Sequence, residues 1–159
     1  MELQIERLAD HQHFIPDLVA AFEKEWPEHY GQDGAGSAVA DINSYASIDT
    51  LPVGLIAYCG DRLYGHMALK PSSITSLPHL TPWAAAGYVI PEFRQQGVGA
   101  KLLIQIEKLA EELKFSRIYC GTSKAHGLLL RGGWDIDQVI HYDESDVTIY
   151  SKRVEEVSK

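Results

Sequence analysis

The sequence has little of what marks several large classes of protein. It contains two cysteines in 159 residues, Cys59 and Cys120, and both lie in apolar stretches, so we expect small buried side chains and no disulfide. No apolar run reaches the roughly eighteen residues that a membrane-spanning helix needs, and the opening Met-Glu-Leu-Gln-Ile-Glu does not resemble a signal peptide. We therefore expect a cytoplasmic protein that has no membrane partner.

Positive charge is scarce as well. The chain has 14 lysines and arginines against 22 aspartates and glutamates, which gives a formal net charge of −8. Such a surface repels the phosphates of nucleic acids and mildly favours a cationic partner, although net charge also simply keeps proteins in solution. The sequence thus predicts no nucleic-acid partner. Because His11 and His13 have no third ligand near them in the sequence, it also predicts no metal site.

What is present is the composition of a globular chain. Apolar residues make up 45% and charged residues 23% of the sequence, and no repeat, linker or low-complexity tract interrupts it. A chain of this length suits one domain and buries roughly 70% of the surface that its unfolded form exposes. We expect a single domain over residues 1–159.

The spacing of apolar residues predicts strands and helices in alternation. Strands are expected at residues 2–8, 51–59, 62–69, 83–90, 117–122, 134–142 and 147–154. Helices are expected from an N-cap at Asp10 to Pro27, with Pro16 in the first turn, and at residues 38–48, 99–114 and 125–131. Loops are expected at residues 28–37 and 71–82, and hairpin turns at 60–61 and 143–146. A helix separates strands 83–90 and 117–122, so these two should be parallel neighbours.

The most specific signal lies in residues 88–103, Tyr-Val-Ile-Pro-Glu-Phe-Arg-Gln-Gln-Gly-Val-Gly-Ala-Lys-Leu-Leu. The apolar strand ends at Pro91, and a Gly-rich turn precedes the amphipathic helix. Gly97 and Gly99 have no Cβ, so backbone N–H groups of residues 95–100 can converge on one point, where the helix dipole adds about half a positive charge. This stretch predicts a binding site for phosphate groups.

A glycine pair before a helix also occurs in two nucleotide-binding motifs, and the sequence matches neither. A dinucleotide-binding turn needs a third glycine three residues after Gly99, where Leu102 stands, and an acidic residue about twenty residues later, which is missing. A P-loop needs a Gly-Lys pair, and the chain contains none. Glycines that only shape a strand-to-helix turn remain an alternative.

Residues 94–99 spell R-x-x-G-x-G, with Val-Ile-Pro shortly before and Leu102-Leu103 after. This phrase closely resembles the acyl-CoA-binding segment of the GNAT superfamily of N-acetyltransferases, and the order of predicted elements resembles that fold from end to end. The resemblance implies an α/β (α+β) fold with a mixed, mostly antiparallel sheet of about six or seven strands flanked by helices, in the order β-α-α-β-β-β-α-β-α-β-β. Gly133-Trp134 is a softer match, to a Gly-Phe pair of the family.

The resemblance also implies acetyl-CoA as cosubstrate. In the family, the strand before the turn pairs with the pantetheine arm and the amides of the turn hold the pyrophosphate. Carried over to this sequence, the cofactor-binding residues are Val89, Ile90, Arg94, Gln95, Gln96, Gly97, Val98, Gly99, Ala100, Lys101 and Ser123.

The catalytic side chains depart from the family pattern. Ala85 stands where many relatives have a glutamate base, and Leu129 stands where they have a tyrosine acid. His66, on a neighbouring strand, is a candidate base because the ordinary pKa of histidine, near 6.5, suits proton transfer. His126 and Ser123 are candidate donors to the leaving sulfur. A buried strand histidine, a surface histidine and a helix N-cap account for the same three residues without catalysis.

The acceptor side of the groove is expected at Trp26, Glu28 and Tyr30, because the family builds it between its first two helices; Glu28 could hold a cationic amine. The resemblance thus predicts an N-acetyltransferase that moves an acetyl group onto a primary amine of a small molecule or peptide by direct attack in a ternary complex, without a metal. The alternative is a non-catalytic acyl-CoA-binding module, which Ala85 and Leu129 favour. A homodimer is left open.

Overall fold

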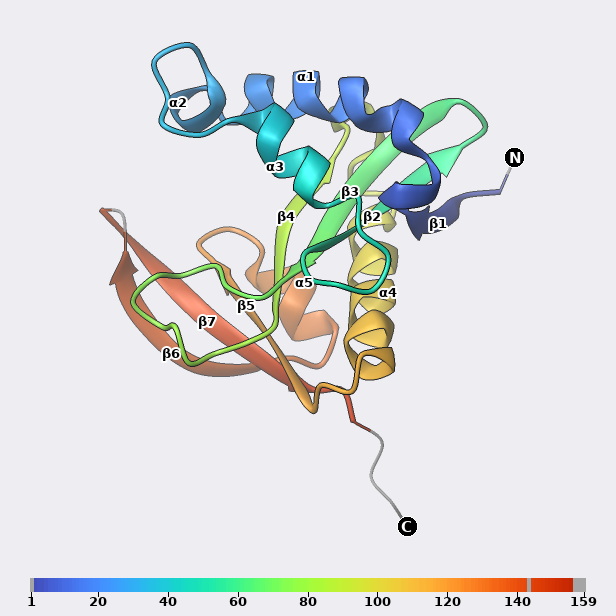
Figure 1. Ribbon diagram of the computed structural model, residues 1–159. Coiled ribbons are helices and arrows are strands. Elements are labelled where there is room, and N and C mark those ends of the chain that lie inside the picture. The colour runs from blue at the N-terminus through green and yellow to red at the C-terminus, as the bar shows by residue number, and fades with distance from the viewer. Residues whose placement is uncertain (1, 143, 156–159) are drawn as a thin grey trace.

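The computed structural model describes residues 2–142 and 144–155, and its seven strands form one sheet in the order β1-β2-β3-β4-β5-β7-β6 (Figure 1). The strands are β1 (Gln4–Arg7), β2 (Val53–Cys59), β3 (Arg62–Lys70), β4 (Trp83–Val89), β5 (Arg117–Thr122), β6 (Asp135–Tyr142) and β7 (Ser145–Arg153). β4 and β5 run parallel, and the other neighbouring pairs run antiparallel. The predicted mixed, mostly antiparallel fold is confirmed.

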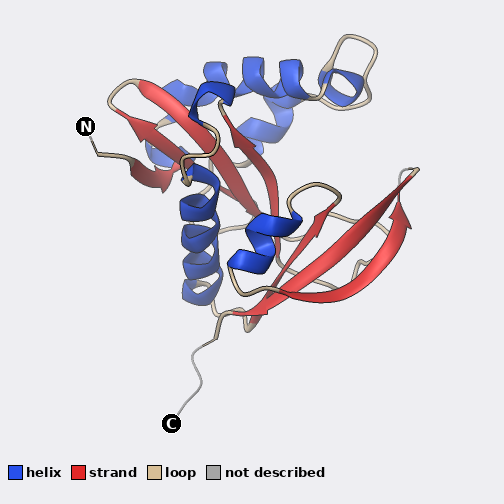
Figure 2. Ribbon diagram, turned by 180° about the vertical axis from the view of Figure 1, so that it is seen from behind, coloured by secondary structure: helices blue, strands red, loops and turns tan. Residues whose placement is uncertain are grey.

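Helices cover both faces of the sheet. They are α1 (Ile15–Glu25), α2 (Pro27–Tyr30), α3 (Ala38–Ser44), α4 (Val98–Glu112) and α5 (His126–Arg131), with short 3-10 turns at Leu8–Asp10, Gln12–Phe14 and Pro91–Phe93. α1 and α3 pack on one face over β2 to β4, while α4 and α5 pack on the other face (Figure 2). None of the helices in the described ranges has the length and apolar character needed to span a bilayer.

The longest helix, α4, shows why its sequence folds this way. Its buried residues recur at helical spacing and form one apolar stripe: Val98, Leu102, Leu103, Ile106, Leu109 and Ala110. Each fully buried aliphatic side chain stabilises the fold by roughly 1.5 to 3 kcal/mol. This packing fixes the start of α4, and therefore the Gly-rich turn, against the sheet.

Several predicted boundaries are wrong. α1 begins at Ile15 and not after Asp10, which lies in a 3-10 turn, because Pro16 is tolerated only in the first turn of a helix. The short α2 begins at Pro27 and takes in residues 28–30 of the predicted loop. α3 ends at Ser44, before the predicted 48. In the turn predicted at 143–146, β7 already begins at Ser145; Asp143 lies outside the described residues.

The predicted absence of a disulfide agrees with the structure. Cys59 ends β2 and Cys120 lies in β5, and no disulfide joins them. Burial raises the pKa of the Cys120 thiol to about 12, so this side chain stays protonated and packs as a small apolar group.

A β-bulge interrupts the pairing of β3 with β4. His66 pairs with Tyr88 and Ala68 pairs with Ala85, so Ala86 and Gly87 together stand opposite the single residue between His66 and Ala68. Ala86 has a φ of +54°, which is uncommon for a residue with a Cβ. The bulge bends β4 next to the point where the sheet opens.

Candidate active site

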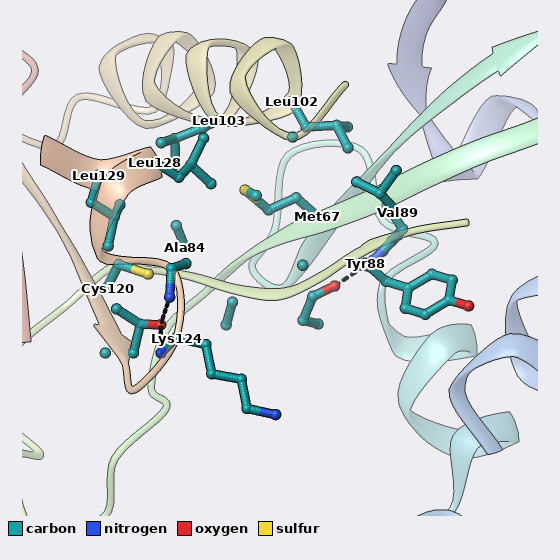
Figure 3. Close-up of a pocket in the computed structure, with 18 of the residues that line it drawn as sticks. Met67, Ala84, Tyr88, Val89, Leu102, Leu103, Cys120, Lys124, Leu128 and Leu129 are labelled. Atoms are coloured by element: carbon teal, nitrogen blue, oxygen red, sulfur yellow. Dashed lines mark hydrogen bonds between the residues drawn. The ribbon is translucent and has the colours of Figure 1, made fainter. Parts of the chain in front are cut away.

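The sheet opens between β4 and β5. Among the described residues the register pairs Trp83 with Tyr119 and goes no further, so the two strands part after this point. A groove with a cavity volume of about 820 Å³ lies where they part, bordered by β4, the start of α4 and the segment from β5 into α5 (Figure 3). Backbone groups along one edge of β4 therefore face a cavity and not another strand.

The interior of the groove is mainly apolar. The side chains that give it this character come from β3, α4 and α5, and are Met67, Leu102, Leu103, Leu128 and Leu129 (Figure 3). Cys120 borders the same space from β5, and its raised pKa excludes it as a thiolate nucleophile at neutral pH. Lys124 extends from the loop before α5 on another side of the groove. This lining suits an uncharged, extended ligand.

The Gly-rich turn (residues 94–100) joins the groove to the start of α4. Gln95 and Gly97 have φ values of +63° and +82°, and Gly97 is the N-cap of a helix that no side chain caps. The first backbone bond into the helix runs from the Lys101 N–H to the Gly97 carbonyl, at 3.1 Å. The N–H groups at the start of α4 are thus unused by the helix and available to an anion.

Arg94 ties the Gly-rich turn to its surroundings. Its Nε donates to the Val89 carbonyl at 2.8 Å, and its guanidinium lies 5.4 Å from the centre of the Tyr88 ring. Its Nη2 is also 3.6 Å from a carboxylate oxygen of Glu25, at the end of α1. The arginine thereby links β4, the turn and α1 across one end of the groove.

The structure brings only some of the predicted cofactor residues to the groove. Val89, Arg94, Gly99 and Ser123 line it. Ile90 still pairs with β3, because its N–H donates to the Tyr64 carbonyl at 2.8 Å. The remaining predicted residues form the outer part of the turn and the first turn of α4, where the side chain of Val98 is buried and those of Gln95, Gln96, Ala100 and Lys101 are exposed.

Aromatic side chains lie beside Arg94 and Glu25 at the same end of the groove. Trp26 lines it, and its ring centre lies 6.0 Å from that of Tyr88 and 6.4 Å from that of Tyr30. Tyr30 faces away, since its hydroxyl donates to Asp41 at 2.7 Å. Glu28 is exposed on α2 and does not border the groove. Burial is the main cause that raises the pKa of Tyr88, and the nearby Glu25 carboxylate adds to it.

His66, the candidate base, is completely buried. Its Nδ1 lies 3.0 Å from the Ala86 carbonyl, and its Nε2 has no hydrogen-bond partner among the described residues. Burial lowers the pKa of His66 to about 4, so the ring is neutral at physiological pH. His66 borders the groove through β3, but this geometry leaves neither nitrogen exposed to a substrate.

Of the remaining candidate catalytic positions, all but His126 line the groove. Ala85 and Leu129, at the usual base and acid positions, both line the groove and bring no ionisable group to it. His126 does not border the groove, and its Nδ1 is 2.8 Å from the Tyr150 hydroxyl. Ser123 borders the groove but does not cap α5; the Thr122 hydroxyl accepts from the N–H groups of Lys124 and Ala125 instead.

Sequence reasoning missed Glu25. Of the described residues that line the groove, it is the only carboxylate, and its side chain is 38% exposed. The signal that could have found it is its position in the last turn of α1, directly before Trp26, which the sequence already places on the acceptor side.

Comparison with known proteins agrees with this geometry. A profile of the acetyltransferase (GNAT) family matches residues 12–130. An aminoglycoside 6′-N-acetyltransferase from Enterococcus faecium superposes with a TM-score of 0.78 at 14% identity, over 100% of both chains, as does an aminoglycoside 6′-N-acetyltransferase complexed with coenzyme A. A Salmonella typhimurium structure with its cofactor acetyl-CoA superposes with a TM-score of 0.70 at 16% identity, over 99% of this chain and 96% of that chain. A search of curated protein sequences found no match.

The order of strands and the groove beside the start of α4 agree with the fold of these acetyltransferase structures. The chain belongs to the acetyltransferase (GNAT) family, because the family profile covers well over half of its length. The predicted family, fold and enzyme class are therefore confirmed, and so is acetyl-CoA as the cosubstrate that this family uses.

Proposed function

We propose that this chain, as one domain over residues 1–159, transfers an acetyl group from acetyl-CoA to a primary amine, and that the two substrates meet in the groove between β4 and β5. The observation that carries the proposal is the continuity of the mainly apolar groove with the uncapped start of α4. A CoA thioester has the same order of parts, namely a diphosphate, an extended arm with amide groups, and the thioester.

Each part of the cosubstrate has a matching surface. N–H groups of the Gly-rich turn would hold the pyrophosphate, since the start of a helix attracts anions. The edge of β4 that β5 leaves unpaired would bond to the amides of the pantetheine arm, as an added strand does. Val89 would lie near the acyl carbonyl, and Ile90 would contribute contact only, because its N–H is already bonded.

The proposed reaction is a direct attack of the amine nitrogen on the thioester carbonyl. The C–N bond forms, the C–S bond breaks, and coenzyme A leaves as a thiolate that takes up a proton. A backbone N–H of β4 aimed at the carbonyl oxygen would stabilise the negative charge that develops there. Holding amine and thioester together is itself worth up to roughly 7 to 11 kcal/mol, so positioning can supply most of the catalysis.

Proton transfers are assigned from what borders the groove. Ala85 brings no base, so we assign removal of the amine proton to water in the open groove. Ser123 borders the groove, and we assign its hydroxyl as the hydrogen-bond donor to the leaving sulfur. His126 does not border the groove and its Nδ1 is engaged with Tyr150, so we assign no proton transfer to it.

The acceptor would enter at the aromatic end of the groove. Trp26 brings an aromatic ring that can attract a cation, and Glu25 adds a negative charge beside it, while the ring of Tyr88 is already covered by the Arg94 guanidinium. This combination favours an acceptor that carries a positive charge and an apolar body, such as a small amine or a peptide end.

Thiol release from acetyl-CoA, measured with a panel of a polyamine, lysine, a peptide with a free N-terminus and an aminoglycoside, tests the proposal. Calorimetry of acetyl-CoA binding is measured alongside. We expect binding together with turnover of at least one cationic amine. Failure to bind acetyl-CoA would refute the proposed function.

Binding without turnover of any amine would support a second function, a non-catalytic acyl-CoA-binding module. The observation that favours it is the pair Ala85 and Leu129, which line the groove where a base and an acid are expected.

A further inference from the structure

A side chain of β3 contacts the bulge in β4. His66 lies on β3, the strand that pairs with β4, and its Nδ1 is 3.0 Å from the carbonyl oxygen of Ala86. Ala86 is the bulge residue with a φ of +54°. The only hydrogen bond of the fully buried imidazole in the described part of the chain is therefore with the carbonyl of a bulge residue.

The protonation state of the ring follows from this contact. A carbonyl oxygen can only accept, so Nδ1 must carry the proton and donate it. In a neutral ring Nε2 then holds a lone pair. Protonating Nε2 would leave a buried N–H without an acceptor and would place a charge among uncharged groups, which is costly. The buried ring thus stays neutral and holds its Nδ1–H toward Ala86.

Neighbouring elements fix the orientation of the ring. Tyr45 stacks on it with ring centres 5.4 Å apart, and Phe22 of α1 meets it edge-on at 5.6 Å. A Cβ added at Gly54 of β2 would come within 2.8 Å of Nε2, so the glycine leaves the space that the ring occupies. Burial raises the pKa of Tyr45 to about 12, so this neighbour is uncharged as well. The ring cannot turn toward the groove without displacing these neighbours.

We propose that His66 is a positioning residue of the acetyltransferase: by donating its Nδ1–H to the Ala86 carbonyl, it fixes the bulge that directs the backbone of β4 into the groove. The inference rests on the proposed function, because it assumes that the thioester lies along β4. The four residues from Ala86 to Val89 all line the groove, and they begin with the bulge itself. A shift of the bulge therefore moves every N–H group in this stretch that could meet the thioester carbonyl.

The tautomer of the ring is the first test, and it needs no substrate. In protein with ¹⁵N-labelled histidine at pH 7, the long-range ¹H–¹⁵N spectrum should show His66 as the Nδ1–H tautomer, which a His66→Asn variant identifies by loss of its signals. The Nε2–H tautomer, or a doubly protonated ring, would overturn the proposal.

A pair of variants gives the second test. Asparagine at position 66 can place an amide N–H near the site of Nδ1, whereas leucine fills similar space without a donor. We expect His66→Leu to lower kcat by on the order of 10- to 100-fold, because a misplacement of about 1 Å can cost that much. The affinity for coenzyme A, measured by calorimetry, should stay within about threefold, since the pyrophosphate is held by the Gly-rich turn. His66→Asn should recover most of the lost kcat.

The outcomes distinguish a positioning role from its alternatives. Equal loss of kcat and of bound coenzyme A in both variants would indicate a general folding defect and would overturn the positioning role. If His66→Asn is as slow as His66→Leu, and its residual kcat no longer falls at acid pH, His66 would be assigned as the base instead. If the wild-type protein acetylates no amine, the proposed function fails while the tautomer result still stands.

Discussion

Gly97 is the residue of the Gly-rich turn at which an added side chain should most affect binding of coenzyme A. Its φ of +82° suits glycine, and a Cβ at this position would meet no atom within 4 Å, so the space beside it is open to a ligand. We expect Gly97→Trp to abolish binding of coenzyme A in calorimetry, because the indole would occupy the place of the pyrophosphate.

Gly133 provides the matched control for this variant. It has the same φ of +82° and the same open space around a Cβ, but it follows the end of α5 and does not precede the start of α4. Both substitutions carry a similar backbone cost, roughly 1 to 3 kcal/mol. Gly133→Trp should therefore bind coenzyme A normally, and normal binding by Gly97→Trp would show that the pyrophosphate site is elsewhere.

The negative charge of Glu25 should attract a cationic acceptor amine. We expect Glu25→Gln to raise the KM for a cationic amine by about tenfold, equivalent to ~1.4 kcal/mol, with the KM for acetyl-CoA little changed. The matched control is Glu28→Gln, three residues further along and outside the groove. Equal effects of the two variants would mean that net charge, and not position, attracts the amine.

The buried His66 should make the fold sensitive to acid. Burial lowers its folded-state pKa from 6.5 to about 4, so the unfolded chain binds a proton at a higher pH than the folded chain does. Stability contributed by the neutral ring is complete above pH 6.5 and is lost as the pH falls toward 4. From pH 6 to pH 5 we expect the wild type to lose about 1 kcal/mol more unfolding free energy than His66→Asn in urea titrations. Parallel pH curves would contradict the assignment of a neutral buried ring.

At the scale of elements, α4 is the support of the Gly-rich turn. Ile106 is fully buried against the sheet, whereas Ile104, on the same helix, is 49% exposed. We expect Ile106→Ala to lower the unfolding free energy by about 2 to 5 kcal/mol, and Ile104→Ala by about 0.5 kcal/mol. Chemical denaturation measures both, and similar losses would mean that α4 does not pack as described.

Elements with a strong apolar pattern could be predicted closely. β5 lies at Arg117–Thr122, as the sequence predicts, and α4 begins one residue earlier than predicted, at Val98. Their patterns are clear because each buries one side against the same core. α1 and α2 were less predictable, since Pro16 and Pro27 are both compatible with a helix start and only tertiary packing decides between the options.

The bulge and the catalytic contacts could not be predicted in this way. The run Ala84-Ala85-Ala86 has identical side chains, so no pattern shows where the extra residue falls; its place depends on the register with β3. His66 could be placed on its strand, but its partner is a backbone carbonyl twenty residues away in sequence. The phosphate-binding turn, by contrast, depends on glycines and a helix start that are adjacent in sequence, and the helix begins at Val98, directly after Gly97.

At the scale of the whole molecule, the groove divides the sheet into two parts. β1 to β4 carry α1, α3 and α4, while β5 to β7 carry α5, and the two parts diverge from the Trp83–Tyr119 pair (Figure 1). A cosubstrate in the groove would contact both parts at once. Bound at 100 times its dissociation constant, coenzyme A should add ~2.7 kcal/mol to the unfolding free energy of the molecule.

Hydrogen exchange can show whether this stabilisation crosses the groove. With coenzyme A bound, we expect slower exchange at β4 amides near Val89 and also at the end of β5 near Thr122, because the ligand restrains opening of both strands. The edge strands β1 and β6 are the internal control and should change little, since they lie farthest from the groove in the order of the sheet. Protection of β4 without β5 would mean that the ligand binds along one strand only, and protection of β6 would place the ligand on a different surface altogether.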